Sequence, residues 1–276
     1  MDLLESKTLK VNQKDGVVYY TFPAFDGLPF IRHGFSTRLG GVSRGDFQSM
    51  NLSFTRGDCP SHVSENFRRF CAAIGVDACN VVISAQQHNT RIYNAAESDR
   101  GRGVTRERVY TDIDGLITDR PDVVLCTQYA DCVPLFFVDP VRRVVATSHA
   151  GWKGTAARIA AVTVDRMCAD YGCRGGDILV GIAPSIGRCC FEVDSPVYEI
   201  FAKMDEFDES CFVAKPVGKY NIDLWEINRR TLLKSGILPQ NITVTDLCTR
   251  CHPEELFLCL SNFFCRVSLA ALISLV

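Results

Sequence analysis

Three residues of this chain have side chains that could together bind a metal ion: His88, Cys132 and His149. Each histidine comes after a short apolar stretch, VVISA before His88 and VVATS before His149, where the chain passes into a loop. Such strand ends are common places for functional residues, because the scaffold is rigid and the loop side chains are exposed. Both histidines are therefore candidate site residues.

Cys132 begins a predicted strand over residues 133–138, and the turn at Asp139-Pro140 predicts a hairpin with the strand that ends at His149. Cys132 and His149 would then lie at the same end of the hairpin. With His88 as a third ligand they would form a His-Cys-His site with an open fourth position, which is typical of catalytic zinc. Copper accepts the same ligands. The gaps of 44 and 17 residues match no local metal motif, so a buried thiol and two ordinary histidines remain the alternative.

Two glycine-containing loops could hold an anion such as phosphate. Lys153 lies in residues 150–154 (AGWKG), before a predicted helix whose N-terminus would favour an anion, and Arg38 begins residues 38–45 (RLGGVSRG). Neither loop has the phosphate-loop spacing, and residues 101–103 (GRG) lack the third glycine of the dinucleotide fingerprint. Ordinary turns are the alternative interpretation.

The remaining histidine and cysteine patterns are less specific. His33 lies in a predicted strand before a glycine-rich loop and is either structural or a substrate contact, whereas His62 is expected in solvent. Residues 248–252 (CTRCH) match the c-type haem pattern, which requires an exported protein, and otherwise could form a redox dithiol. A structural zinc site would need a second cysteine pair, and Cys189 and Cys190 are adjacent instead of spaced as CxxC.

The elements that must position these residues are helices and strands without regular βαβ alternation. This mixture predicts an α/β fold in α/β/α layers with mixed sheet or sheets, forming one domain over residues 1–276. Apolar spacing predicts helices over residues 62–74, 154–171, 195–204 and 220–235. Predicted strands include residues 115–118, 123–127, 133–138, 143–149, 178–182 and 242–245.

Composition excludes several classes of protein. The 276 residues contain 30 Lys+Arg and 32 Asp+Glu, a formal net charge of −2, which does not fit a protein whose main partner is nucleic acid or an anionic membrane. With 47% hydrophobic residues the chain is globular in type. The first residues show no secretory signal, so the 14 cysteines are expected to be mostly free thiols in a reducing, cytoplasmic environment.

The C-terminal residues 256–276 are apolar and long enough to cross a bilayer. Asn262 and Arg266 lie near the middle of this segment, where an arginine costs roughly 2.5–3.5 kcal/mol on insertion scales. We therefore expect two buried strands, or a strand and a helix, in preference to a membrane tail.

Seven blocks in order resemble the laccase-domain family, long labelled multicopper polyphenol oxidases and later recognised as purine nucleoside phosphorylases. The resemblance covers about residues 15–252. The blocks are residues 33–43 (HGFSTRLGGVS), 51–53 (NLS), 86–88 (QQH), 114–116 (DGL), 130–134 (ADCVP), 149–154 (HAGWKG) and 181–190 (GIAPSIGRCC).

This resemblance implies a layered laccase-domain (cytotoxic necrotising factor-like) fold and a zinc ion held by His88, Cys132 and His149. It implies a cytosolic enzyme, monomeric or homodimeric, that cleaves adenosine, inosine, guanosine and S-methyl-5'-thioadenosine with phosphate to the base and the (methylthio)ribose 1-phosphate. Deamination of adenosine to inosine is also implied. A copper-dependent polyphenol oxidase is the older alternative, but several copper ions need many ligands and this chain has five histidines. The residues expected near substrate and phosphate are Arg38, Asn51, Lys153, Asp131, as acid/base or orienting group, and His33.

The resemblance fails near the C-terminus. The family typically continues with a Ser-His-Arg-Arg-type segment and a Gly-Arg pair, whereas residues 258–266 read LCLSNFFCR, where only Arg266 could replace the later arginine. Two hypotheses follow: a local frameshift, which resequencing would test, or a catalytically impaired homologue that still binds purines.

Overall fold

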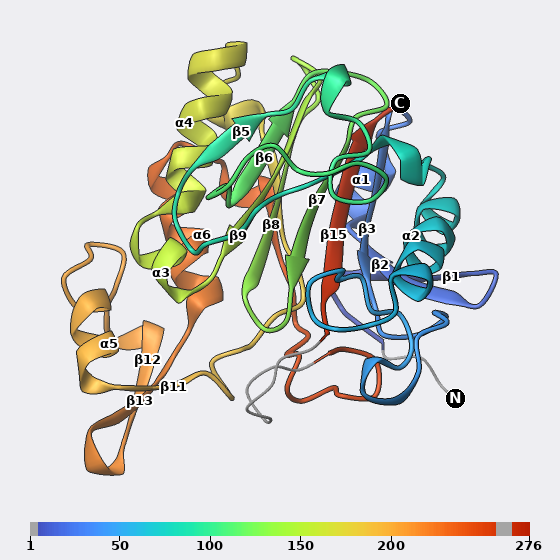
Figure 1. The fold of residues 1–276 in the computed structure, drawn as a ribbon. Coiled ribbons are helices and arrows are strands. Elements are labelled where there is room, and N and C mark those ends of the chain that lie inside the picture. The colour runs from blue at the N-terminus through green and yellow to red at the C-terminus, as the bar shows by residue number, and fades with distance from the viewer. Residues whose placement is uncertain (1–4, 258–266) are drawn as a thin grey trace.

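Two six-stranded mixed sheets pack face to face in the computed structural model, which describes residues 5–257 and 267–276 (Figure 1). The first sheet has the order β1-β2-β3-β15-β7-β4, with β1 Lys10–Lys14, β2 Val17–Thr21, β3 Ile31–Ser36, β15 Leu269–Leu275, β7 Val124–Tyr129 and β4 Val81–Ile83. The second has the order β14-β10-β8-β9-β6-β5, with β14 Ile242–Val244, β10 Leu179–Ile182, β8 Val133–Asp139, β9 Val144–Ala150, β6 Gly115–Thr118 and β5 Ile92–Asn94.

Helices cover the two outer faces, so the layers run α/β/β/α (Figure 1). Helix α2 (Pro60–Ile74) packs on the first sheet through the apolar stripe that predicted it, and ends at Gly75 in the left-handed conformation. Helices α4 (Ile159–Tyr171) and α6 (Leu224–Lys234) cover the second sheet. The predicted α/β fold with mixed sheets is confirmed. The layers are α/β/β/α where α/β/α was expected, because two sheets and not one lie between the helices.

The predicted helix bounds differ from those observed: α2 begins at Pro60 and not at His62, and the helix expected over residues 195–204 ends at Phe201. The helix expected over residues 154–171 is interrupted at Arg158, whose φ of 57° separates α3 (Trp152–Ala156) from α4. The helix expected over residues 220–235 begins only at Leu224, because the Asp223 carboxylate accepts a hydrogen bond from the Glu226 amide and caps it there.

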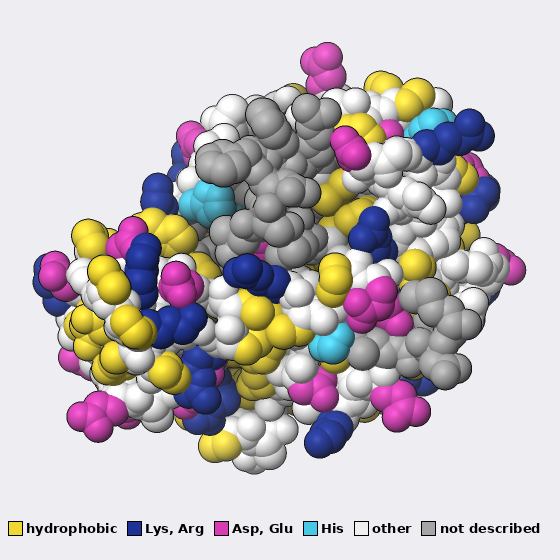
Figure 2. Space-filling view, turned by 90° about the horizontal axis from the view of Figure 1, so that it is seen from below, with side chains coloured by type: hydrophobic (Ala, Val, Ile, Leu, Met, Phe, Trp, Pro, Cys, Tyr) yellow, Lys and Arg dark blue, Asp and Glu magenta, His cyan; other side chains and the backbone are white. Residues whose placement is uncertain are grey.

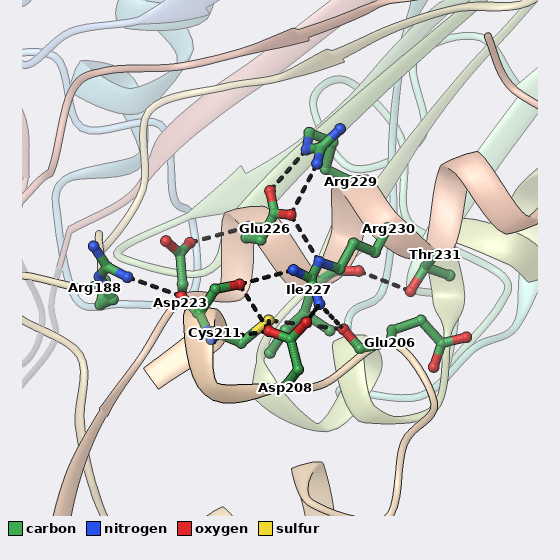
Figure 3. Close-up of polar contacts among 11 residues, drawn as sticks. Arg188, Glu206, Asp208, Cys211, Asp223, Glu226, Ile227, Arg229, Arg230 and Thr231 are labelled. Atoms are coloured by element: carbon green, nitrogen blue, oxygen red, sulfur yellow. Dashed lines mark hydrogen bonds and ion pairs between the residues drawn. The ribbon is translucent and has the colours of Figure 1, made fainter. Parts of the chain in front are cut away.

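A small third sheet extends beside α6 and contains β11 (Glu192–Asp194), β13 (Lys219–Ile222) and β12 (Phe212–Lys215), next to α5 (Ser195–Phe201). Its attachment to α6 is partly ionic (Figure 3). The Arg230 guanidinium lies 2.7 Å from carboxylate oxygens of both Asp208 and Glu226. One guanidinium thus joins the helix to the loop that leads into β12. Helix α1 (Pro23–Asp26) follows β2 and completes the helices described.

The hairpin predicted at Asp139-Pro140 is present as β8–β9, with Pro134 paired to His149 and Val133 to Ala150. Every residue of both strands is buried, because helices cover one face of this sheet and the first sheet covers the other. Cys132 and His149 therefore lie at the same end of the hairpin, as expected.

The apolar C-terminus forms β15, which lies between β3 and β7 and pairs antiparallel with both. This confirms one of the two elements expected for residues 256–276; residues 258–266, including Asn262 and Arg266, lie outside the described residues. Among the helices described, none is long and apolar enough to cross a membrane. On the face shown in Figure 2, the described basic and acidic side chains are interspersed, in keeping with the small net charge.

His33 on β3 lies in an aromatic cluster with Phe22, Phe25 and Phe136, and is 5% exposed. Its Nε2 accepts a hydrogen bond from the Phe22 amide at 2.8 Å, so this nitrogen carries a lone pair and the ring is neutral. Burial lowers the pKa of His33 to about 3. Of the two roles considered for His33, this geometry fits the structural one and not a substrate contact.

We expect Leu272→Ala to lower the free energy of unfolding by about 2–5 kcal/mol, since Leu272 is fully buried in the middle of β15. Urea unfolding measures this difference. Val276→Ala, at a side chain 43% exposed, is the control and should change stability by less than about 0.5 kcal/mol. Equal effects of the two substitutions would contradict a core role for β15.

We expect His33 to make the fold less stable as pH falls from about 6.5 toward 3. The unfolded chain binds a proton at His33 below about pH 6.5, whereas the folded chain does not until about pH 3, so protonation favours unfolding throughout this window. At pH 5 the loss is about 2 kcal/mol. His33→Gln retains an acceptor for the Phe22 amide and should flatten the pH dependence of urea unfolding; an unchanged slope would contradict the assignment.

Candidate functional site

His88, Cys132 and His149 come together at one end of the second sheet. Their potential ligand atoms all lie within 4.8 Å of one another, and the two imidazole ring centroids are 4.8 Å apart. His88 comes from the loop after β4, Cys132 from the turn between β7 and β8, and His149 from the end of β9. His88 itself has a left-handed φ of 61°, which shows that its loop is held in an uncommon conformation.

The Asp114 carboxylate holds this loop in place. It accepts hydrogen bonds from three consecutive amides, those of Gln87, His88 and Asn89, at 2.8–3.0 Å. It also lies 2.8 Å from Nδ1 of His149, while the His149 amide donates to the Asp114 carbonyl. With its Nδ1 proton donated to Asp114, His149 leaves Nε2 as the nitrogen that a metal could bind by displacing its proton, the arrangement in which a carboxylate orients a ligand histidine.

These contacts determine the charges at the centre. Burial alone would raise the pKa of Asp114, but hydrogen bonds from His149 and the amides of Gln87 and Asn89 outweigh it and lower that pKa. Burial likewise opposes ionisation of Cys132, yet His149 and His88 lower the pKa of its thiol to about 6. His149 responds in the opposite direction, its pKa raised against the effect of burial by Cys132 and Asp114. Cys132 is therefore held toward the thiolate form, which is the form that binds metals.

Gly151 leaves the space that the centre needs. A Cβ atom at this position would lie 2.7 Å from Nδ1 of His88 and 3.1 Å from Sγ of Cys132. Only a residue without a side chain therefore allows the two ligands to approach the start of α3 so closely. Two imidazoles and a thiolate around this space fit zinc, and also copper, with one coordination position left open.

The centre borders a cavity of about 660 Å³, large enough for a small molecule. Two arginines, Arg56 and Arg108, lie in its wall, and Arg108 is anchored by a 2.6 Å hydrogen bond to the Ser84 carbonyl. The described lining residues are Ser53, Thr55, Arg56, Ser84, Ala85, Gln86, Gln87, His88, Arg108, Tyr110, Thr111, Asp112, Gln128, Tyr129, Ala130, Cys132, His149 and Ser268.

The other residues expected near the substrate are not among those lining the cavity in the described part of the chain. The Arg38 guanidinium donates to the carbonyls of Gln48 and Pro253 at 2.9 and 2.7 Å. Lys153 extends over the ring of Trp152, with Nζ 5.6 Å from its centroid. His33 lies in the aromatic cluster described above.

Asn51 and Asp131 are also buried beside the cavity wall instead of in it. Asn51 donates to the Asp58 carboxylate at 2.9 Å and accepts from the Ser268 amide, an arrangement that ties the loop after β3 to the start of β15. Asp131 accepts a 2.7 Å hydrogen bond from the Thr249 hydroxyl, and its φ of 91° turns the chain directly before Cys132. This geometry corresponds to the orienting role considered for Asp131.

Sequence reasoning missed Asp114, Arg56 and Arg108. Asp114 belongs to the DGL block, but its role depends on a contact with His149, 35 residues away, and no local spacing predicts that contact. The one available signal was an aspartate directly before a strand that is fully buried. A carboxylate in such a place needs several hydrogen-bond donors, which suggests that it holds other residues in position. The arginines occur in loops with no motif.

Comparison with known proteins identifies relatives over most of the chain. Residues 32–259 match the family model described as multi-copper polyphenol oxidoreductase laccase. Purine nucleoside phosphorylase YlmD of Bacillus subtilis (strain 168) is 34% identical over 222 residues, which are 80% of each chain. Adenosine deaminase RL5, from an unknown prokaryotic organism, is 34% identical over 226 residues, 81% of this chain and 86% of that protein.

Solved structures agree with the sequence comparison. The crystal structure of the Bacillus licheniformis hypothetical protein YfiH superposes with a TM-score of 0.90 at 32% identity, covering 98% of this chain and all of the other. YlmD from Geobacillus stearothermophilus gives a TM-score of 0.87 at 31% identity over 96% and 98% of the two chains. On the evidence of this match and these relatives, the chain belongs to the multi-copper polyphenol oxidoreductase laccase family, which includes proteins named purine nucleoside phosphorylases.

Proposed function

We propose that this protein is a zinc-dependent purine nucleoside phosphorylase. The observation that supports this most directly is the placement of a three-ligand centre, His88, Cys132 and His149, in the wall of a cavity that also carries two arginines. A nucleoside and a phosphate ion together need this combination of room and positive charge. The names of the relatives point to the same reaction, with adenosine, inosine, guanosine and S-methyl-5'-thioadenosine as the proposed substrates.

The three ligands would hold zinc, which when bound supplies a Lewis acid and lowers the pKa of a coordinated water. Asp114 keeps the Nδ1 proton on His149 and fixes the orientation of the ring. Arg56 and Arg108 are the proposed phosphate contacts, since phosphorolysis requires phosphate held in line with C1′ while charge develops on base and sugar.

Deamination of adenosine to inosine is the proposed second activity. A water activated beside the ligand set could attack C6 of adenine, and one relative carries the name adenosine deaminase. Copper-dependent oxidation of phenols is the competing activity suggested by the family description, and it predicts oxygen uptake instead of nucleoside cleavage. A purine-binding homologue without activity is the third possibility, motivated by residues 258–266, which lie outside the described part of the chain.

Asp131 would act as a positioning residue, and Arg56 and Arg108 replace Arg38 and Lys153 as the proposed phosphate contacts. Arg38 and Lys153 were expected there from their glycine-containing loops, but the Arg38 donors bind backbone carbonyls and neither residue lines the described cavity wall. Asn51 and His33 would act by supporting the fold. We further propose a cytoplasmic enzyme, monomeric or homodimeric, acting on free nucleosides and phosphate.

We expect purified protein incubated with adenosine and phosphate to form adenine, ribose 1-phosphate and inosine, measured by liquid chromatography. Cys132→Ala and His149→Ala should each abolish metal binding at this centre and reduce phosphorolysis to background, because two ligands cannot replace the three-donor set. Cys168→Ala, at a half-buried cysteine outside this group, is the matched control. Full turnover in either ligand variant would refute the centre, and oxygen uptake with phenols in place of nucleoside cleavage would favour the copper alternative.

We expect Arg56→Ala to raise the KM for phosphate about tenfold, the loss of one charged hydrogen bond of about 1.5 kcal/mol, with little change in the free energy of unfolding. Arg38→Ala should do the reverse, lowering stability because its guanidinium joins two loops and leaving the phosphate KM unchanged. Steady-state kinetics with varied phosphate and urea unfolding separate the two effects. A raised phosphate KM in Arg38→Ala alone would restore the assignment expected from the sequence.

A further inference from the structure

A second group of potential metal ligands lies outside the centre described above. Sγ atoms of Cys189, Cys190, Cys248 and Cys251 all lie within 4.8 Å of one another, and all four are free thiols. Cys189 and Cys190 belong to the turn between β10 and β11, whereas Cys248 and Cys251 follow β14. This cysteine cluster borders a separate cavity of about 510 Å³, so it is not part of the wall that carries His88 and His149.

The sulfur separations fit a tetrahedral metal better than a disulfide. Sγ of Cys251 lies 3.6 Å from Sγ of both Cys189 and Cys190. Four thiolates bound to zinc at about 2.3 Å lie about 3.8 Å from one another, whereas bonded sulfurs are about 2.05 Å apart. Because one sulfur is equally close to two others, the cluster is arranged around a common point and not as a single pair.

The backbone directs adjacent cysteines to one side. The amides of Cys190 and Phe191 both donate to the Gly187 carbonyl, which closes a tight turn. A Cβ at Gly187 would lie 3.0 Å from the Trp225 ring and 3.4 Å from Sγ of Cys189, so glycine permits the close packing of this turn. The adjacent pair, which the sequence did not favour as metal ligands, thereby lies beside the two cysteines of the CxxC turn.

Hydrogen bonds hold the two loops together around the sulfurs. The Gly187 amide donates to Sγ of Cys248 at 3.2 Å, and the Thr249 amide donates to the Ser185 carbonyl at 3.0 Å. Outside the turn, the Asn221 side-chain amide donates to the Arg188 carbonyl at 2.8 Å, and the Arg188 guanidinium donates to the Ser210 carbonyl at 2.9 Å. The ligand atoms are thus positioned by contacts from both sides of the cluster.

A redox dithiol fits these features less well. Cys248 and Cys251 lie in a non-helical turn and not at a helix N-terminus, which is one of the features that activate reactive CxxC pairs. A dithiol also uses two sulfurs, and here four converge. Four thiolates without an open position are the donor set of a structural zinc site.

We propose that Cys189, Cys190, Cys248 and Cys251 bind one structural zinc ion that fastens the turn after β10 to the loop after β14. The site also connects to the first centre through the chain itself. Thr249, between two of the ligands, donates to the Asp131 carboxylate at 2.7 Å, and Asp131 directly precedes Cys132. Zinc in the cysteine cluster would therefore restrain the segment that positions Cys132 without contacting substrate.

Metal analysis of the purified, reduced full chain tests this proposal independently of catalysis. We expect two zinc ions per wild-type chain, one per chain in the double variant Cys248→Ser/Cys251→Ser, and one per chain in Cys132→Ala. Cys79→Ser, at an exposed cysteine outside both groups, is the matched control and should keep two. Loss of the zinc from the first centre alone would leave the count of the cysteine cluster unchanged, so failure of the proposed function and failure of this inference are distinguishable.

Cobalt substitution provides a second measurement that does not depend on the double variant folding. Cobalt-loaded Cys132→Ala should keep the intense thiolate-to-cobalt absorption of a four-sulfur site, and the added substitution Cys251→Ser, at an exposed position, should weaken it because one thiolate is lost. Chelation should lower the Tm of Cys132→Ala. An unchanged zinc count in Cys248→Ser/Cys251→Ser, a Cys132→Ala variant that binds no metal, or a metal-free disulfide detected by mass spectrometry in protein purified without reductant would each overturn the proposal.

Discussion

The candidate centre depends on the hydrogen bonds that the Asp114 carboxylate accepts. This carboxylate is completely buried, and a buried carboxylate is stable only when its oxygens accept enough hydrogen bonds. Three successive amides of the His88 loop and the His149 ring provide them. These hydrogen bonds offset the cost of burying the carboxylate. They also fix the loop that carries His88 and orient the ring of His149. This single side chain, directly before β6, thus joins the loop after β4 to the end of β9.

The packing of the two sheets provides the rigidity that this centre needs. The hairpin β8–β9 is buried on both faces, so the register that places Pro134 opposite His149 also fixes Cys132 at the adjoining turn. Gly151 follows immediately and leaves room for His88 and Cys132 to approach the start of α3. Two ligands thus come from loops and one from the end of β9, and the strands β8 and β9 together with Gly151 determine their positions.

Local patterns predicted much of this arrangement, and long-range contacts account for what they missed. The apolar stripe of α2, the β8–β9 hairpin and the meeting of Cys132 with His149 all depend on neighbouring residues, so the sequence could indicate them. The left-handed Arg158 that separates α3 from α4 has no comparable signal. Arg38 shows the same limit: its glycine-rich loop suggested an anion site, but the guanidinium binds carbonyls 10 and 215 residues away. Only the tertiary fold decides whether the Arg38 guanidinium binds an anion or these carbonyls.

The two sulfur-containing groups differ in a way that assigns them different roles. His88, Cys132 and His149 supply three donors beside a cavity, which leaves a position for water or substrate, whereas the cysteine cluster supplies four donors and leaves none. A closed site can stabilise loops but cannot activate a reactant. Because Thr249 links the cluster to Asp131, stabilising those loops would reduce the freedom of the segment that carries Cys132. The proposed structural metal would then assist the proposed chemistry through preorganisation: a ligand held in position before an ion binds loses less conformational entropy when it does.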